Sequence, residues 1–161
     1  MKIRSCLTTD AHQLVEIYNH FILNSTATFE EAIIDVDEMI NRIASISSNY
    51  PFLVCESDEQ IMGYAYAVRW KERSAYRYSL ETTVYVRPNH QREGVGRLLY
   101  LELLEQLRLR GFHCGLAGIT LPNRPSVEFH ESLGFEKVGQ LKQVGFKFGE
   151  WIDVGYWQII L

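Results

Sequence analysis

The segment that most restricts the fold of this 161-residue chain runs from a strand, through a turn with two glycines, into a long helix. Residues 78–88, "YSLETTVYVRP", are rich in β-branched residues and end at a proline, which predicts a strand that stops there. Residues 98–111, "LLYLELLEQLRLRG", place apolar side chains at helical spacing and end at a capping glycine. A strand, a short turn and a helix in this order indicate an α/β domain.

The rest of the chain divides into strand and helix patterns of ordinary length. Helices are expected over 11–24 and 35–46, and over 123–134 with a start near Pro125. Irregular or polar connections are expected at 25–31, 71–77 and 143–151, the last because it contains two glycines. The further expected strands are 2–7, 51–57, 60–70, 114–120, 135–142 and 153–161. Together they predict a single domain over 1–161, a mixed sheet that carries helices.

Composition restricts the class of partner. The formal net charge is −4, which argues against a general nucleic-acid binder or a protein of anionic membranes. The N-terminal segment lacks the apolar core of a signal peptide, and no apolar run is long enough to cross a bilayer. The three cysteines, Cys6, Cys55 and Cys114, include no C-x-x-C pair and are interpreted as reduced, buried thiols. We therefore expect a cytoplasmic protein.

The turn "HQREGVGR" (90–97) can hold an anion, although it matches neither G-x-x-x-x-G-K-[S/T] nor G-x-G-x-x-G. Gly94 and Gly96 let the backbone approach a ligand closely, and N–H groups at a helix start attract phosphate. Arg92 and Arg97 can add charged contacts. The alternative is a plain helix entry in which the glycines serve geometry alone. The spacing by itself leaves both interpretations open.

Two segments in the right order resemble the GNAT superfamily of N-acetyltransferases. Gln91-x-x-Gly94-x-Gly96 matches its Q/R-x-x-G-x-G/A signature, and "NRPSVEFHESLGF" resembles its asparagine-led helix that ends in L-G-F. The resemblance implies the GNAT-type fold, a central mixed and mostly antiparallel sheet flanked by about four helices. It also implies acetyl-CoA as co-substrate, without a metal.

A narrower resemblance covers nearly the whole chain. "STATFEE", "GYAYAVRWKERSAYRYSLETTVYV" and the tail "GEWIDVGYWQ" are similar to the phosphinothricin and methionine-sulfoximine acetyltransferase branch of that superfamily. This implies acetylation of the α-amino group of a small amino acid analogue, such as phosphinothricin, methionine sulfoximine or methionine sulfone. Members of this branch are commonly homodimers, so a homodimer is expected.

The resemblance also implies which residues bind the cofactor. The main chain of Val84, Tyr85 and Val86 would pair with the pantetheine arm as an added strand would. Asn123 would hydrogen-bond the same arm, although a simple helix cap explains an asparagine there equally well. The pyrophosphate would lie on the turn, against Gln91, Arg92, Glu93, Gly94, Val95, Gly96 and Arg97.

Two residues are the candidates for proton transfer. Glu81 is a lone carboxylate in an otherwise uncharged strand, and the branch assigns a glutamate at this position as the base; a surface-facing strand glutamate is the alternative. His130 lies seven positions after Asn123, hence on the same helix face, where many relatives carry a tyrosine that protonates the thiolate. It could instead orient a water, help the base or satisfy a backbone group. The family implies direct attack within a ternary complex, which requires no covalent nucleophile.

The substrate site is expected around the segment "WKERSAY" and the start of the strand that follows. Arg73 is the candidate partner for the substrate carboxylate, because its planar guanidinium suits that geometry. Lys71 and Glu72 could equally be solvated loop charges, and Phe29 could be core. The full expected set is Phe29, Lys71, Glu72, Arg73, Tyr76, Thr82 and Thr83. His12, His20, His90 and His113 lack metal-ligand spacing, so no metal site is expected.

Two other functions remain open at this level. The chain could be a GNAT enzyme for another small amine or a protein N-terminus. It could also be a non-catalytic acyl-CoA sensor, which would need the phosphate turn alone. The presence of both Glu81 and His130 argues against the sensor.

Overall fold

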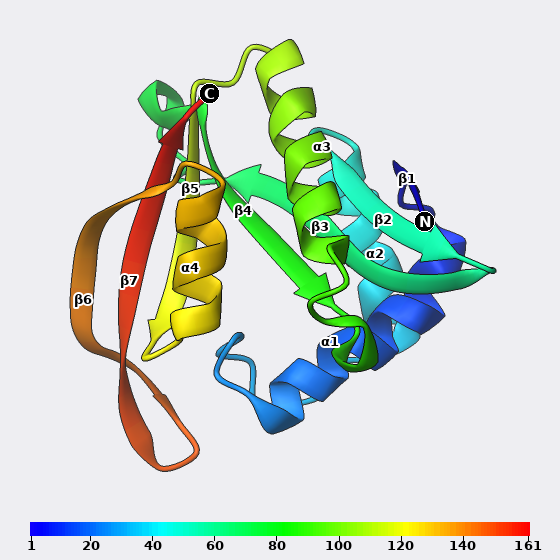
Figure 1. Cartoon of the computed structure of the whole chain (residues 1–161), viewed down its shortest axis with the longest axis horizontal. Coiled ribbons are helices and arrows are strands. Elements are labelled where there is room, and N and C mark those ends of the chain that lie inside the picture. Colours follow the sequence, from blue (N-terminus) through cyan, green and yellow to red (C-terminus); the bar gives the residue numbers. More distant parts are fainter.

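The computed structural model describes all residues from Met1 to Leu161 and forms one seven-stranded sheet with four α-helices. The strand order is β1-β2-β3-β4-β5-β7-β6, and every neighbouring pair is antiparallel except β4 with β5 (Figure 1). The predicted mixed, mostly antiparallel sheet with about four helices is confirmed. The elements are β1 Lys2–Ser5, α1 Ala11–Asn24, α2 Val36–Ser47, β2 Phe52–Ser57, β3 Gln60–Arg69, β4 Ser79–Val86, α3 Val95–Leu109, β5 Cys114–Leu121, α4 Arg124–Ser132, β6 Glu136–Lys147 and β7 Glu150–Ile160.

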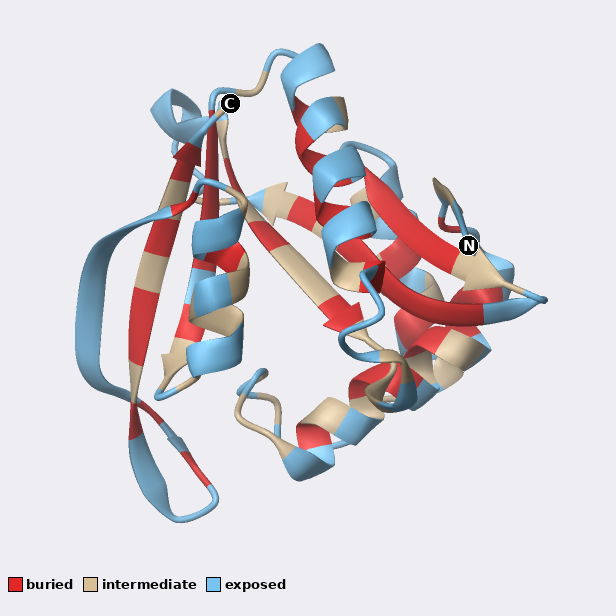
Figure 2. Cartoon of the chain, viewed as in Figure 1, coloured by how far each residue is buried: buried red, intermediate tan, exposed pale blue.

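Helices cover both faces of the sheet, and the strands supply a core to each. In β2, Phe52 and Val54 pack with α1 and α2, whereas Leu53 and Cys55 pack with α3 on the other face. This is the period-2 alternation of a strand that is buried on both sides. Figure 2 shows buried residues along β2, β3, β4, β5 and β7, whereas β6 is exposed over most of its length. The three cysteines are free and buried, as expected.

The sheet forks between β4 and β5. These strands pair only where Ser79, Leu80 and Glu81 meet Cys114, Gly115 and Leu116. Beyond Glu81, β4 continues beside β3 and β5 continues beside β7, and the two diverge (Figure 1). Backbone N–H and C=O groups of β4 that face the gap therefore have no strand partner, although buried backbone groups normally find one.

The expected loop at 143–151 is wrong. β6 runs through most of it to Lys147, and β7 already begins at Glu150. The ladder is interrupted between Leu141 and Gly145, where Gln143 has a φ of 52°. The strand thus continues past a local irregularity, and the tight turn falls at Phe148 and Gly149, both with positive φ. The two glycines mark a bulge and a hairpin turn instead of an open loop.

α3 also begins earlier than expected, at Val95, so that Gly96 and Arg97 belong to its first turn. No helix in the chain is both long and apolar enough to span a lipid bilayer.

Candidate active site

The glycine turn presents unpaired backbone donors. Arg92 and Gly94 have φ values of 67° and 85°, and Gly94 stands at the N-terminus of α3 without any side-chain cap. The N–H groups of the first turn of a helix have no carbonyl partner within the helix, so these donors can bind a ligand oxygen. Arg92 and Arg97 are exposed beside them. Glu93 pairs with His90 at 3.0 Å, which occupies its carboxylate within the turn.

Gly96 has a packing role in addition. A Cβ there would lie 3.4 Å from Val86 Cγ2 and 3.5 Å from Phe129 Cζ, so α3 packs closely against β4 and α4 at this point. The turn is thereby held at the open end of the fork. The expected cofactor residues of the turn therefore lie next to the expected cofactor residues at the end of β4.

The side chains of the proposed cofactor strand are packed, as expected. Val84 and Val86 contact the α3 core, and Tyr85 packs edge-on to Tyr18 of α1 at 5.3 Å between ring centroids. Only the main chain of these three residues is left to face the gap between β4 and β5.

Asn123 acts as the N-cap of α4. Its Oδ1 accepts a hydrogen bond from the Ser126 N–H at 3.2 Å, which is the cap role. The cap uses only the oxygen, so the Nδ2 donors can still reach a ligand, and the contact of Asn123 with the cofactor stays a prediction.

A cleft of about 270 Å³ lies beside the fork and contains Glu81. Its walls come from the segment after α1 and from β4, β5, β6 and β7. Two of its residues, Glu81 and Phe29, were expected from the sequence. The cleft is lined by Thr26, Ala27, Phe29, Glu81, Gly118, Thr120, Leu141, Val144, Val154 and Tyr156.

The Glu81 carboxylate binds a proton more readily than an ordinary glutamate does. Burial raises its pKa above the ordinary glutamate value, and the positive charge of Lys71 partly offsets that rise. No hydrogen bond from the protein contributes to this pKa, so the carboxylate is not held by an internal donor. Burial together with the nearby Glu81 also raises the pKa of Tyr156, which keeps that phenol neutral.

Several residues that line the cleft were not expected from the sequence. Thr26 and Thr120 hydrogen-bond each other at 3.1 Å across 94 positions, and Tyr156 packs edge-on to Trp70 at 5.3 Å. Gly118 leaves room for both Glu81 and Tyr156. Only the strand order, which places β7 beside β5, and the course of the chain after α1 bring these groups together. Gly118 and Thr120 share one face of a strand, and that spacing was the one available signal.

His130 lies in a buried hydrogen-bonded series on the α3 and α4 side of the sheet. Its Nδ1 lies 2.7 Å from the Ser126 carbonyl and must donate to it, so Nε2 accepts from the Tyr100 hydroxyl at 3.1 Å. Because Tyr100 donates its proton to His130, its oxygen can only accept from the Thr82 hydroxyl, which lies 3.0 Å away. The single Thr82 proton is shared between the Tyr100 oxygen and the Leu116 carbonyl, which is 3.1 Å away. Burial lowers the pKa of His130, while its bond to Ser126 favours the charged form, and the net result is a neutral ring.

This series shows where two of the expected site residues point, and their roles in the reaction stay predictions. Thr82 is buried with its hydroxyl engaged internally, so it does not line the cleft. Since side chains alternate along a strand, Glu81 and Thr82 point to opposite faces of β4. His130 therefore contacts Tyr100 instead of the cleft that holds Glu81. Thr83 lies on the Glu81 face, close to the phenol of Tyr66.

The charged residues of the 71–77 loop remain at the surface. The Lys71 ammonium lies 5.0 Å from the centre of the Trp70 ring, and Glu72 pairs with Arg69 at 3.1 Å. Arg73 and Tyr76 are exposed and do not line the cleft. The solvated interpretation of Glu72 is the one that the structure shows. A substrate contact by Arg73 stays a prediction.

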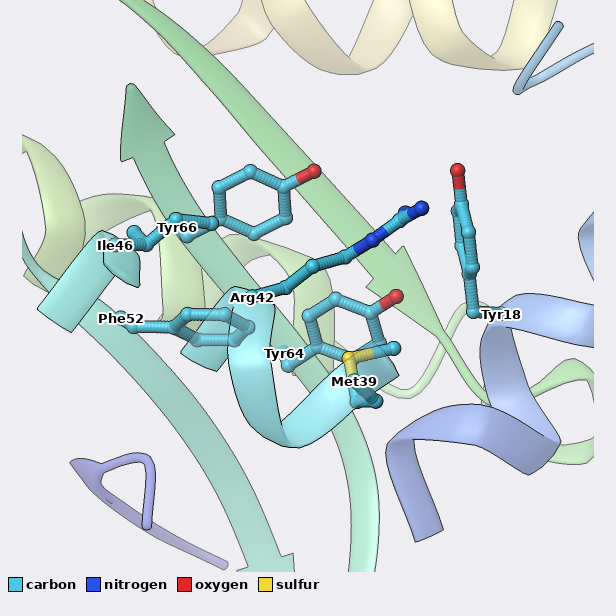
Figure 3. A pocket seen from close by; sticks show the side chains of 7 residues that line it. All are labelled: Tyr18, Met39, Arg42, Ile46, Phe52, Tyr64 and Tyr66. Carbon is cyan, nitrogen blue, oxygen red and sulfur yellow. The ribbon is translucent and has the colours of Figure 1, made fainter. Parts of the chain in front are cut away.

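A second pocket, of about 20 Å³, lies under α2 and has room for about one water (Figure 3). The Arg42 guanidinium lies beside Tyr18, and the Tyr64 and Tyr66 phenols point toward the same side. Arg42 already pairs with Glu30 and Glu38 at 2.9 and 2.7 Å. This pocket is too small to hold a substrate.

A forked sheet with a glycine turn at its open end and a carboxylate without an internal donor in the adjoining cleft is the arrangement expected of an acyl-CoA-dependent transferase. The family comparison is more specific, because the acetyltransferase (GNAT) domain model matches residues 3–155. The chain therefore belongs to the GNAT acetyltransferase family.

Relatives cover the chain from end to end. It is 41% identical to phosphinothricin N-acetyltransferase of Streptomyces viridochromogenes, over 98% of this chain and 86% of the relative. It is 38% identical to L-methionine sulfoximine/L-methionine sulfone acetyltransferase of Salmonella typhimurium, over 100% and 95%.

Two solved structures have nearly the same backbone. A ribosomal-protein-alanine N-acetyltransferase from Brucella melitensis has a TM-score of 0.98 at 37% identity, with 100% of both chains covered. An acetyltransferase from Salmonella typhimurium with its cofactor acetyl-CoA has a TM-score of 0.97 at 37% identity, over 100% of this chain and 94% of that one.

Proposed function

We propose that the protein transfers the acetyl group of acetyl-CoA to the α-amino group of a small amino acid analogue, by direct attack within a ternary complex. The observation that carries this proposal is Glu81, a half-buried carboxylate without an internal donor, in a cleft that adjoins the fork. Relatives named for phosphinothricin and for methionine sulfoximine and sulfone support this class of substrate.

Three groups in the chain take part in the proposed reaction: the glycine turn, the β4 main chain and Glu81. The donors of the glycine turn and the charges of Arg92 and Arg97 bind the pyrophosphate, and the β4 main chain aligns the pantetheine arm in the fork. Glu81 takes the proton of the substrate ammonium, directly or through a water, and its raised pKa makes it a better base. The freed amine attacks the thioester carbon, and as the C–S bond breaks the nitrogen loses a second proton, which the departing thiolate takes up to give CoA thiol and the amide.

His130 can assist only through its neighbours, because both of its ring nitrogens are bonded to protein groups. It holds the Tyr100 hydroxyl, which contacts Thr82 beside the point where β4 and β5 separate. We propose a supporting role here, which fixes the geometry of the fork.

The shape and lining of the cleft fit a small, partly apolar substrate. Its volume of about 270 Å³ is near the lower end of ligand pockets, and it is lined by more apolar than polar side chains. Release of CoA thiol would be followed against amino acids and their sulfoximine, sulfone and phosphinyl analogues. Turnover of an analogue is expected, and no turnover with any of them despite acetyl-CoA binding would contradict the proposal.

A protein N-terminus is the second candidate, since one close structural neighbour is named for ribosomal-protein alanine. Peptides that begin with alanine would therefore join the same panel. A small analogue should give the higher kcat/KM, because the α1–α2 segment and the β6–β7 hairpin both line the cleft and limit its size. Measurable turnover of either class rules out a non-catalytic sensor.

We also propose a homodimer formed through the β6–β7 hairpin. β6 is an edge strand, exposed on both faces over most of its length. Its apolar exposed side chains need a partner, and a second copy supplies a matching surface. Light scattering coupled to size exclusion should give twice the 18.7 kDa chain mass. The exposed apolar side chains of the hairpin that do not line the cleft are Val138, Phe146, Phe148 and Trp151. A cytoplasmic location stays a prediction.

A further inference from the structure

A buried lysine joins the β6–β7 hairpin to the segment that follows α1. Lys147 stands near the end of β6, and only 2% of it is exposed. Its Nζ donates to the carbonyls of Ser25 and Thr28, each at 2.8 Å, and lies 5.0 Å from the centre of the Phe148 ring. Burying an ammonium is costly unless its donors are paired, so these contacts must compensate for lost water.

The β6–β7 hairpin and the segment after α1 also meet at Gly145, two residues before Lys147, where an aromatic ring packs on the hairpin backbone. The Phe29 ring lies against the backbone of Gly145, so closely that a Cβ on Gly145 would overlap it. Phe29 is a wall of the cleft that contains Glu81, and Val144 from the hairpin is another. One patch of contacts thus fixes two walls of the cleft relative to each other.

The 25–31 segment has few other constraints. It has no helix or strand of its own, and Thr26 and Thr28 attach it through single hydroxyl bonds to Thr120 and Tyr18. In addition, the Tyr85 hydroxyl donates to the Ala27 carbonyl at 3.4 Å and Glu30 pairs with Arg42 at 2.9 Å. Charge-assisted bonds are roughly twice as strong as neutral ones. Lys147 supplies the two charge-assisted bonds made to this segment's backbone, at Ser25 and Thr28, whereas Arg42 holds the side chain of Glu30. Lys147 is therefore the charged anchor of the part of the segment that leads into Phe29.

We propose that Lys147 is a positioning residue, which holds the 25–31 segment against the β6–β7 hairpin so that Phe29 forms a fixed wall of the acceptor site. Gly145 is required opposite Phe29, because any side chain there would push the ring into the cleft. The effect on acetyl transfer rests on the proposed function, but the anchoring of the segment does not. Lys147 is not expected to touch the reacting atoms.

The first test compares Lys147→Met with Lys142→Met. Lys142 lies on the same strand, but its side chain is 83% exposed and its nearest acidic partner is 3.9 Å away. With an amine substrate found in the panel, Lys147→Met should raise the KM for the amine roughly tenfold, whereas kcat and the acetyl-CoA affinity change little. Lys142→Met should leave all three unchanged. A fall in kcat with an unchanged KM would overturn the positioning role.

The second test needs no substrate. Hydrogen exchange followed by mass spectrometry should show faster exchange at residues 25–31 in Lys147→Met, with α3 and β4 unchanged. Equal protection in Lys147→Met and the parent protein would overturn the anchor, whatever the panel shows. Faster exchange without turnover of any amine would instead support the anchor and contradict the proposed function.

A double-mutant cycle covers the case in which Lys147→Met fails to fold. Gly145→Ala alone should raise the amine KM, because its methyl group displaces Phe29. In a Phe29→Ala background the ring is absent, and the same Gly145→Ala change should have almost no further effect. Additive effects of the two substitutions would show that Gly145 and Phe29 do not act on the site through their contact.

Discussion

Gly118 of β5 faces Glu81 of β4 across the fork, at the position where the sheet loses its pairing. A Cβ on Gly118 would lie 3.5 Å from the Glu81 Oε1 and 3.3 Å from Cε1 of Tyr156. The absent side chain is thus what lets the carboxylate and the phenol share the cleft. Because β4 pairs with β5 no further than Glu81, this carboxylate stands at the apex of the gap proposed for the pantetheine arm.

Gly118→Val should block the cleft without unfolding the protein. Valine suits a strand, but its methyl groups would occupy the space between Glu81 and Tyr156. We expect kcat/KM for the amine to fall by roughly 100-fold, while acetyl-CoA affinity changes by less than about threefold. Steady-state kinetics and calorimetric binding test this. Unchanged kinetics would show that the substrate binds elsewhere.

Glu81→Gln should separate chemistry from cofactor binding. Glutamine keeps the size of the side chain and removes the proton acceptor, so kcat should fall by about 10²–10⁴-fold. The acetyl-CoA dissociation constant should stay near that of the parent protein, since the glycine turn that is proposed to bind the pyrophosphate is untouched. A variant that kept full activity across pH would exclude Glu81 as the base.

Lys71→Met should move the acid limb of the pH–rate profile. Activity needs ionised Glu81, so kcat/KM should rise with pH through a pKa above the ordinary glutamate value. The Lys71 charge lowers that pKa, and its removal should shift the limb to higher pH. The measurement is kcat/KM between about pH 4 and pH 9. Glu72→Gln is the matched control in the same loop, and a limb that did not move in Lys71→Met would contradict the coupling.

Local patterns predicted most of the elements, because helices and strands follow short-range periodicity. α1 has the expected bounds, and α2 differs by about one residue since Asp35 caps it through the Glu38 N–H. The 143–151 segment was misread because a bulge and a tight turn use the same glycines as an open loop. Pairing with β7 decided the outcome, and pairing is a long-range property.

The site was predicted in part for the same reason. Glu81 and the glycine turn lie in recognisable local patterns, whereas Tyr156 and Thr26 reach the cleft only through the strand order and the course of the chain after α1. Thr82 is a different case. Strand alternation alone places its side chain on the face opposite to Glu81, so the sequence already indicated that the two residues do not share one cleft.

The neutral, buried His130 should make stability depend on pH. Its pKa is lowered by burial in the folded protein, so the unfolded chain binds a proton more readily as pH falls through its ordinary value near 6.5. The unfolding free energy should therefore decrease below that pH, by at most about 1.4 kcal/mol per pH unit from this residue. Stability above about pH 7 should not change on its account. Urea titrations at pH 7.5 and pH 5.5 measure the difference.

His130→Gln retains a side-chain oxygen that can accept from Tyr100 and removes the titration. The variant should be less stable at pH 7.5, because its amide replaces a ring that packs against Tyr100 and Phe135 at 5.2 and 5.4 Å. Its loss of stability between pH 7.5 and pH 5.5 should be smaller than that of the parent protein. His12→Gln, at an exposed position, is the control and should keep the parent's pH dependence. If His130→Gln and the parent lost equal stability over this range, His130 would not be the group that is neutral in the fold and protonated on unfolding.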